Sequence, residues 1–206
     1  AHCRALLDEA SAASAARSVP SCGPRLNLSV KPSALTPRFD SISPQDSIER
    51  AAHRLLPLVS SAARHGGLIT LDMEHYELKD LTIEIFKDLL MEPEFKAYPH
   101  WGCVIQAYLR DSLKDIRELI EFSKTRGVPF TIRLVKGAYW DAETIEGEAH
   151  QFTPPQFLNK EESDLHFRQL CYKALQNGEW IQLAVGSHNL QDHAFVEALR
   201  KLKFPE

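Results

Sequence analysis

Short apolar runs that end in polar residues alternate along this chain with longer stretches of helical periodicity. The apolar runs are RLNLSVK, GLITLDMEH, GCVIQAYLR, FTIRLVKGAYW and IQLAVGSHN. An order of strand, helix, strand and helix predicts an α/β fold built on a parallel sheet. The apolar runs show little alternation of apolar and polar residues, so we expect both faces of the sheet to be covered.

The stretches between the apolar runs carry apolar residues at helical spacing. Leu113, Ile116 and Ile120 form one stripe, and Gly127 closes the helix that it predicts. Three further stripes repeat the pattern: residues 78–89, 167–175 and 195–202. Each stripe predicts a helix that packs one face against the sheet.

Two closures are open to such a sheet: an open, doubly wound arrangement and a (β/α)8 barrel. The sequence contains neither G-x-G-x-x-G nor G-x-x-x-x-G-K-[ST], the phosphate-binding motifs that accompany many open sheets. Instead, every predicted strand ends in polar residues, which is how barrels build their active sites. We therefore predict a partial (β/α)8 TIM-type barrel, with its first five strands present and its last three absent.

The predicted domain boundary lies at residue 23. Residues 1–22 are rich in Ala and Ser and are expected to form a helix and a linker, and residues 23–206 are expected to form the partial barrel. The chain begins with Ala1 and stops just after a helical pattern, so we expect a fragment of a longer parent. A barrel without three strands exposes two sheet edges, so the fragment alone is expected to be inactive.

Composition narrows the function class. The net charge is −4 and the basic residues are scattered, so no nucleic-acid contact is expected. No apolar stretch approaches the roughly 20 residues that a membrane span requires. The four cysteines lack metal-type spacing, which predicts reduced, buried thiols in a cytosolic setting and no metal site.

The polar strand ends are the candidate binding residues. They are Lys31, Asp72, Gln106, Arg133 with Lys136, and His188 with Asn189. Arg133 lies deepest in its strand, and a buried guanidinium needs a partner such as Asp72 or a ligand anion. Tyr139, Trp140 and His188 offer rings that can stack on a ligand. Each residue alone has a structural explanation, but together they predict a site for an anionic, aromatic ligand.

Several motifs then resemble one family. IRLVKGAYWD resembles the fourth-strand signature of the proline dehydrogenase domain in bifunctional proline utilization A flavoenzymes. LSVKPSAL is similar to the first-strand motif of that domain, LDMEH to the second, GCVIQAY to the third and VGSHN to the fifth. Five motifs in the family's order make the resemblance specific, and it extends along nearly the whole chain.

The resemblance implies a flavoenzyme of proline catabolism. Members bind FAD in a barrel and oxidise L-proline to Δ1-pyrroline-5-carboxylate, the first step from proline to glutamate. A hydride passes from proline C5 to flavin N5, and the electrons then pass to a membrane quinone. It further implies a bacterial cytoplasmic protein that is peripheral at the inner membrane, with an NAD-dependent aldehyde dehydrogenase domain in the same parent chain.

The resemblance also implies a role for each candidate on the cofactor side. Arg133 would bond the flavin near N5, and Gln106 would hold the pyrimidine edge of its ring. The remaining cofactor residues would line the linker or the border of FAD: Lys136, Gly137, Trp140, His188 and Asn189.

Three residues fall on the substrate side. Lys31 would pair with the proline carboxylate, Tyr139 would cover the proline ring, and Asp72 would order the cationic groups around it. The chain departs from the family pattern in LDMEH, where Met73 replaces Ala and His75 replaces the second Glu.

Two other readings remain open at this point. A Schiff-base aldolase would use Lys31 or Lys136, because barrels often place reactive lysines at strand ends. A non-catalytic barrel remnant would keep the fold without turnover.

Overall fold

A computed structural model describes residues 5, 8–9, 24 and 26–204. Nearly all of residues 1–22, predicted as a helix and linker, lie outside this set. The chain forms two compact units. The first comprises the described residues up to Met73 together with Glu77–Cys103, and the second comprises Glu74–Tyr76 and the described residues from Val104 onward.

The first unit is built on parallel strands. Strand β1 pairs with β2 from Asn27↔Leu68 to Val30↔Leu71, and β2 pairs with the start of β3. Helix α2 packs against β2. The elements are β1 (Asn27–Val30), the short helix η1 (Pro32–Ala34), α2 (Pro44–Arg64), β2 (Leu68–Leu71), α3 (Tyr76–Met91) and β3 (Trp101–Gln106), which continues into the second unit.

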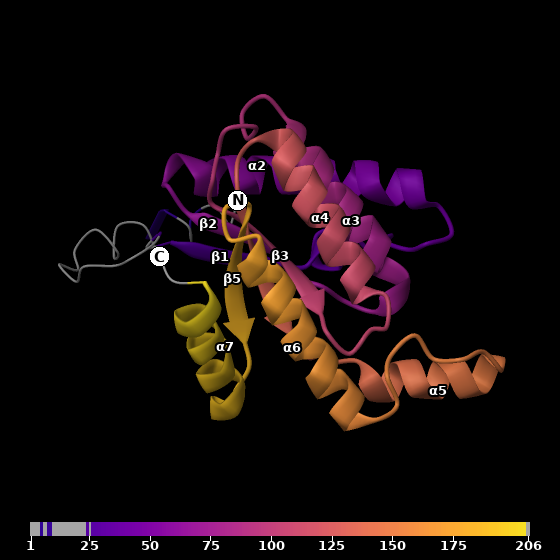
Figure 1. The fold of residues 1–206 in the computed structure, drawn as a ribbon. Helices are drawn as coiled ribbons and strands as arrows, with labels where there is room; N and C mark the ends of the chain where they lie inside the picture. The colour runs from indigo at the N-terminus through magenta and orange to yellow at the C-terminus, as the bar shows by residue number, and fades with distance from the viewer. Residues whose placement is uncertain (1–4, 6–7, 10–23, 25, 205–206) are drawn as a thin grey trace. The chain divides into compact units, whose positions relative to one another are not determined.

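The second unit repeats the same alternation. Strand β4 pairs in parallel with β5, and α6 packs against both strands and against α7. Figure 1 shows α6 and α7 beside β5, and α5 projecting away from these strands. The elements are α4 (Ser112–Arg126), β4 (Phe130–Val135), α5 (Trp140–His150), α6 (Lys160–Gln176), β5 (Ile181–Gly186) and α7 (Leu190–Lys203).

Strand order follows chain order, β1-β2-β3-β4-β5, among the described residues. Parallel strands in chain order, joined by helices, are the arrangement of consecutive βα units in a (β/α)8 barrel. This confirms the predicted α/β class, and it is consistent with the first five units of a barrel.

The predicted helical stripes are buried where they meet the strands. Ile116 and Ile120 of α4 are buried, as are Phe167 and Leu170 of α6. Helix α4 ends at Gly127, whose φ of 77° closes it in the left-handed conformation that glycine favours. The stripe on α7 is the exception: Leu202 at its end is 79% exposed.

Strand β4 corrects the expectation that both sheet faces are covered. Every residue of β3 is buried, but β4 alternates between buried and half-buried positions. Phe130, Ile132 and Leu134 point to the covered face, whereas Thr131, Arg133 and Val135 are half-buried. The sequence FTIRLV contains this alternation, because Thr and Arg occupy every second position.

Candidate functional site at the strand ends

Lys31 and Asp72 meet at neighbouring strand ends in the first unit. Val30 is in register with Leu71, so the next residue of each strand is Lys31 or Asp72. The Asp72 amide donates to the Val30 carbonyl at 2.8 Å, and the Ser29 hydroxyl donates to the Asp72 carboxylate at 3.5 Å. Lys31 is exposed and Asp72 is half-buried. The fold thus brings together a cation and an acid that are 41 residues apart.

Arg133 lies on the half-buried face of β4, which pairs with β5. Its register partner is Ala184, and Val135 pairs with Gly186. A Cβ built on Gly186 would lie 2.7 Å from Val135 Cγ1 and 3.5 Å from Arg133 Cγ. Gly186 therefore leaves the space that the Val135 side chain occupies on this face, and it lies within ordinary contact distance of the Arg133 stem.

Gln106 ends β3 as a buried amide with spare bonding capacity. The residue is 3% exposed, and no hydrogen bond to its side-chain oxygen Oε1 occurs among the described residues. Its backbone carbonyl accepts from the Ser112 hydroxyl and from the Leu109 amide. These two bonds fix the turn after β3, so the amide is rigidly placed. A buried acceptor without a partner is costly, which marks Gln106 as a candidate ligand-binding residue.

Lys136 is held by two carboxylates. Its ammonium nitrogen lies 2.7 Å from Asp164 on α6 and 3.0 Å from Asp192 on α7. Burial lowers the pKa of Lys136, but the hydrogen bonds that its ammonium donates to Asp164 and Asp192, together with their negative charges, outweigh this effect and leave the pKa raised. Lys136 therefore stays protonated, and it ties the end of β4 to α6 and α7.

Gly137 packs against the ring of Tyr108. Its φ is 139°, and a Cβ built there would lie 2.1 Å from Tyr108 Cδ1. The Tyr108 amide also donates to the carbonyl of Lys136 at 2.7 Å. We expected Gly137 to let the backbone approach a cofactor, and Tyr108 supplies a second reason for glycine at this position.

Tyr139 and Trp140 begin helix α5. The Tyr139 ring lies 4.3 Å from that of His75 between ring centroids, at an interplanar angle of 47°. The Trp140 indole nitrogen donates to the Phe157 carbonyl at 3.0 Å, and the residue is 40% exposed. His75, which replaces an acid in the family pattern, thus becomes a ring partner of Tyr139.

Glu143 of α5 is a buried carboxyl group that accepts hydrogen bonds from two residues outside its helix. It is 3% exposed, and its Oε1 accepts from the Tyr76 amide at 2.9 Å and from the Tyr108 hydroxyl at 3.1 Å. Burial raises the pKa of Glu143, against the lowering effect of these two hydrogen bonds. Burial is the largest cause that raises the pKa of Tyr108, and the negative charge of Glu143 raises it further. Tyr108 therefore remains a phenol that donates to Glu143.

The segment from Gly137 to Gln156 leaves the sheet, and the residues on either side of it, Lys136 and Phe157, both hydrogen-bond the backbone of Tyr108. The Tyr108 amide bonds the carbonyl of Lys136, and the Tyr108 carbonyl accepts from the Phe157 amide at 2.8 Å. Next to it, Leu109 and Gln156 form an antiparallel bridge. We call residues 137–156, which include α5, the α5 excursion.

His188 and Asn189 follow β5 and are exposed. The Asn189 side-chain oxygen accepts from the Gln191 amide at 2.9 Å, so it caps α7. Ser187 donates to Asp192 at 2.6 Å, which also fixes this turn. Asn189 therefore has a structural role here.

The remaining features of the described residues bear on chemistry only weakly. Cys103 and Cys171 are buried free thiols, as predicted, and burial raises the pKa of Cys171 to about 12. No group of three or more His, Cys, Asp or Glu side chains in the described ranges is placed to hold a metal ion. None of the helices in those ranges is long and apolar enough to cross a membrane.

Comparison with known families decides the assignment. The family model described as proline dehydrogenase matches residues 1–204 of the chain. This chain belongs to the proline dehydrogenase family.

Individual members of the proline dehydrogenase family are moderately similar in sequence. Bifunctional protein PutA of Escherichia coli is 28% identical over 173 residues, which are 84% of this chain and 13% of PutA. Proline dehydrogenase 1 of Bacillus subtilis is 31% identical over 167 residues, which are 81% of this chain and 48% of the relative. The chain thus spans about an eighth of one relative and about half of the other.

Solved structures agree with the assignment. A crystal structure of proline utilization A from Bdellovibrio bacteriovorus, inactivated by N-propargylglycine, matches with a TM-score of 0.94 and 37% identity. The match covers 98% of this chain and 22% of that one. A structure of proline utilization A from Bradyrhizobium japonicum matches with a TM-score of 0.89 and 27% identity, over 97% of this chain and 20% of the other.

Four residues of this proline dehydrogenase family chain escaped the sequence reasoning: Tyr108, Glu143, Asp164 and Asp192. Asp164 and Asp192 bond Lys136. Tyr108 packs against Gly137, and Glu143 accepts from the Tyr108 hydroxyl. Glu143 and Asp192 lie in the first turns of the helices that follow β4 and β5. An acid in the first turn after a strand is a usable signal, but it also suits the helix dipole, so it did not stand out.

Proposed function

We propose that the protein to which this chain belongs is an FAD-dependent proline dehydrogenase. It oxidises L-proline to Δ1-pyrroline-5-carboxylate, the first step in the conversion of proline to glutamate. The observation that carries the proposal is the buried oxygen of Gln106 at the end of β3, which no described residue bonds, in a chain of the proline dehydrogenase family.

The residues present fit the cofactor. The pyrimidine edge of a flavin carries an N–H group, and Gln106 Oε1 is a buried acceptor in need of such a donor. Trp140 and His188 are exposed, so their rings are available to border a bound ligand. Lys136 and Gly137 form the adjoining wall, with the Lys136 ammonium held by Asp164 and Asp192.

When bound, the flavin supplies at N5 the acceptor for the hydride that leaves proline C5. Arg133 places a guanidinium on the half-buried face of β4, where a fixed cation stabilises negative charge as it develops. A preorganised charge of this kind costs little reorganisation during the reaction. Gln106 orients the ring from a rigid turn, and Asn189, whose oxygen caps α7, is the weakest of the cofactor candidates.

The substrate residues bind and position. Lys31 attracts the proline carboxylate, and Asp72, at the neighbouring strand end, orients the ammonium by charge. Tyr139, held against His75, covers the proline ring and helps to exclude water. These roles supply proximity and orientation, which is what a hydride transfer requires.

The proposal includes partners and place. A membrane quinone takes the electrons, so the protein works in the bacterial cytoplasm and meets the inner membrane peripherally. An NAD-dependent aldehyde dehydrogenase domain belongs to the same parent chain. The Escherichia coli relative PutA is a bifunctional protein, which supports a second activity in the parent chain.

The state of Lys136 counts against the aldolase reading. A Schiff-base lysine must lose its proton to attack a carbonyl, and enzymes lower the pKa of such lysines. Two carboxylates instead raise the pKa of Lys136. Lys136 is therefore a structural cation and a poor nucleophile.

The test is spectroscopic. The protein expressed from its complete gene should be yellow, and its flavin should bleach when L-proline is added without oxygen. Arg133→Met should lower the rate of flavin reduction about 100-fold, the loss typical of removing one preorganised charge. Arg117→Met, at an exposed position on α4, is the matched control and should change nothing. A colourless protein that FAD cannot reconstitute would refute the proposal.

A further inference from the structure

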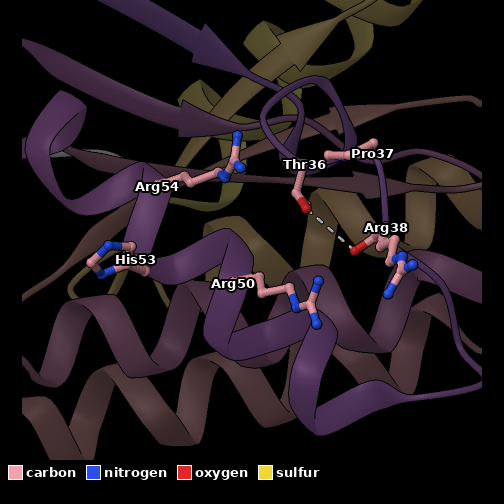
Figure 2. Close-up of a pocket in the computed structure, with 6 residues that line it drawn as sticks. All are labelled: Thr36, Pro37, Arg38, Arg50, His53 and Arg54. Carbon is pink, nitrogen blue, oxygen red and sulfur yellow. Dashed lines mark hydrogen bonds between the residues drawn. The ribbon is translucent and has the colours of Figure 1, made fainter.

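The first unit contains a pocket of about 360 Å³ whose six lining residues include three arginines and a histidine. It lies between the loop after η1 and the first turns of α2, and Figure 2 shows its lining residues. The lining residues are Thr36, Pro37, Arg38, Arg50, His53 and Arg54. None of them belongs to the strand-end site described above.

The charge of this arginine pocket is strongly one-sided. It contains three guanidinium groups, and the acid that contacts one of them is Asp46, 2.7 Å from Arg50. Glu49, the next acid on α2, lines a different pocket and accepts from Gln45. Three arginines against one paired aspartate leave a net charge of about +2, before any contribution from His53.

Arg38 is the cation with the most bonding capacity to spare. In the part of the chain that the structure describes, no hydrogen bond or ion pair engages its guanidinium. In Figure 2 the Arg38 and Arg50 guanidinium groups lie at one end of the pocket, and the His53 imidazole lies at the other. A guanidinium carries five N–H donors in a planar fork, which matches the oxygens of an anion.

The wall of the pocket is fastened in place. Arg54 donates to the Leu35 carbonyl at 2.9 Å, so the loop is tied to the third turn of α2. The Ser47 hydroxyl donates to the Asp40 carbonyl at 2.9 Å and accepts from the Asp40 amide at 3.2 Å. A preformed pocket loses less entropy on binding than a mobile one.

Asp40 is kept from neutralising the pocket. Its Oδ1 accepts from the amides of Ile42 and Ser43, at 3.1 and 3.2 Å. These bonds turn the carboxylate toward the start of α2. The acid nearest in sequence to Arg38 therefore bonds backbone amides at the start of α2, and no described hydrogen bond or ion pair joins it to the Arg38 guanidinium.

We propose that the arginine pocket binds the phosphate group of a phosphate monoester. The net charge of about +2 matches a phosphate monoester, which carries about −1.5 to −2 at neutral pH, better than it matches a single carboxylate. Arg38 and Arg50 bond the phosphate oxygens, and the Thr36 hydroxyl, which donates to the Arg38 carbonyl at 3.4 Å, helps to hold the Arg38 backbone in place. Neither the flavin nor proline enters this argument, so the pocket can be tested separately from the proposed oxidation.

The probe is glycerol 3-phosphate, titrated calorimetrically into the protein expressed from its complete gene. Arg38→Gln should weaken binding at least about tenfold, because it removes a charge-assisted contact to the phosphate. Arg64→Gln, on an exposed residue at the end of the same helix, should leave the affinity within about twofold of wild type. Raising the salt concentration should weaken binding by the wild type more than by Arg38→Gln.

A second arm identifies the source of the phosphate. Vesicles of phosphatidylcholine with phosphatidic acid present the same group on a membrane. Vesicle binding that Arg38→Gln abolishes supports the pocket and assigns it to lipid, and binding of glycerol 3-phosphate alone assigns it to a soluble metabolite. If Arg38→Gln fails to fold, Arg38→Lys keeps the charge, loses the fork and should still weaken binding several-fold. Absence of binding in both arms, or binding that is equal in wild type and folded Arg38 variants, overturns the proposal.

Discussion

Replacing Gly137 by alanine tests whether the ring of Tyr108 shapes the segment after β4. The new Cβ would lie 2.1, 2.3 and 2.6 Å from three ring atoms of Tyr108. Such distances are far inside van der Waals contact, so the ring or the backbone must move. Overpacking of this kind costs about 1–3 kcal/mol. The φ of 139° adds backbone strain of about 1–3 kcal/mol.

The total expected loss is about 2–6 kcal/mol in the free energy of unfolding. Urea unfolding, followed by intrinsic fluorescence, measures it as a shift of the midpoint at constant slope. Gly127→Ala is the matched control, because its φ is also positive, at 77°, but nothing lies within 4 Å of its added Cβ. That variant should lose only its backbone strain, about 1–2 kcal/mol.

A double-mutant cycle isolates the contribution of the ring. With Tyr108→Ala as background, Gly137→Ala should cost only its strain, so the coupling energy between the two positions should be about 1–3 kcal/mol. If Gly137→Ala costs no more than Gly127→Ala, and costs the same with and without the Tyr108 ring, the packing argument is refuted.

Three further predictions concern the buried titratable residues Glu143, Asp192 and Cys171. Glu143 has a raised pKa, so the folded protein holds the proton of this carboxyl group more tightly than the unfolded chain does. The stability of the wild type relative to Glu143→Gln should therefore fall as pH rises from about 4.5 through the raised pKa. A difference in urea midpoint that stays constant across pH 4–8 would contradict this. Asp192→Asn should cost about 1–3 kcal/mol of unfolding free energy, and more than Asp164→Asn, because Asp192 is 5% exposed and Asp164 is 28% exposed; equal losses would contradict the burial argument. Cys171 should resist iodoacetamide at pH 8 until urea is added, since burial raises its pKa to about 12, and rapid labelling of the folded protein at this residue would count against it.

Local pattern was enough to predict the fold class and the positions of the candidate residues. The spacing of apolar residues fixed the helix around Ile116 and Ile120, and the polar strand ends placed Lys31 and Asp72 as neighbours. Both inferences need only the period of an element and the rule that parallel strands end at the same edge.

Partnerships across the chain could not be predicted in this way. Lys136 meets Asp164 and Asp192, which lie 28 and 56 residues further along the chain. Their distance in space depends on how α6 and α7 pack, and the apolar period of a helix leaves its exact rotation and offset open. The same limit hid the second reason for Gly137, because the Tyr108 ring comes from the turn after β3.

The α5 excursion has a consequence for motion. Its two ends are held by the amide and the carbonyl of one residue, Tyr108, while Arg133 and Gln106 belong to the strands themselves. Local opening of the excursion would break the bonds of Glu143 to Tyr76 and Tyr108, but it would leave the ladder between β4 and β5 intact. We expect amide hydrogens of residues 140–150 to exchange with solvent faster than those of residues 130–135.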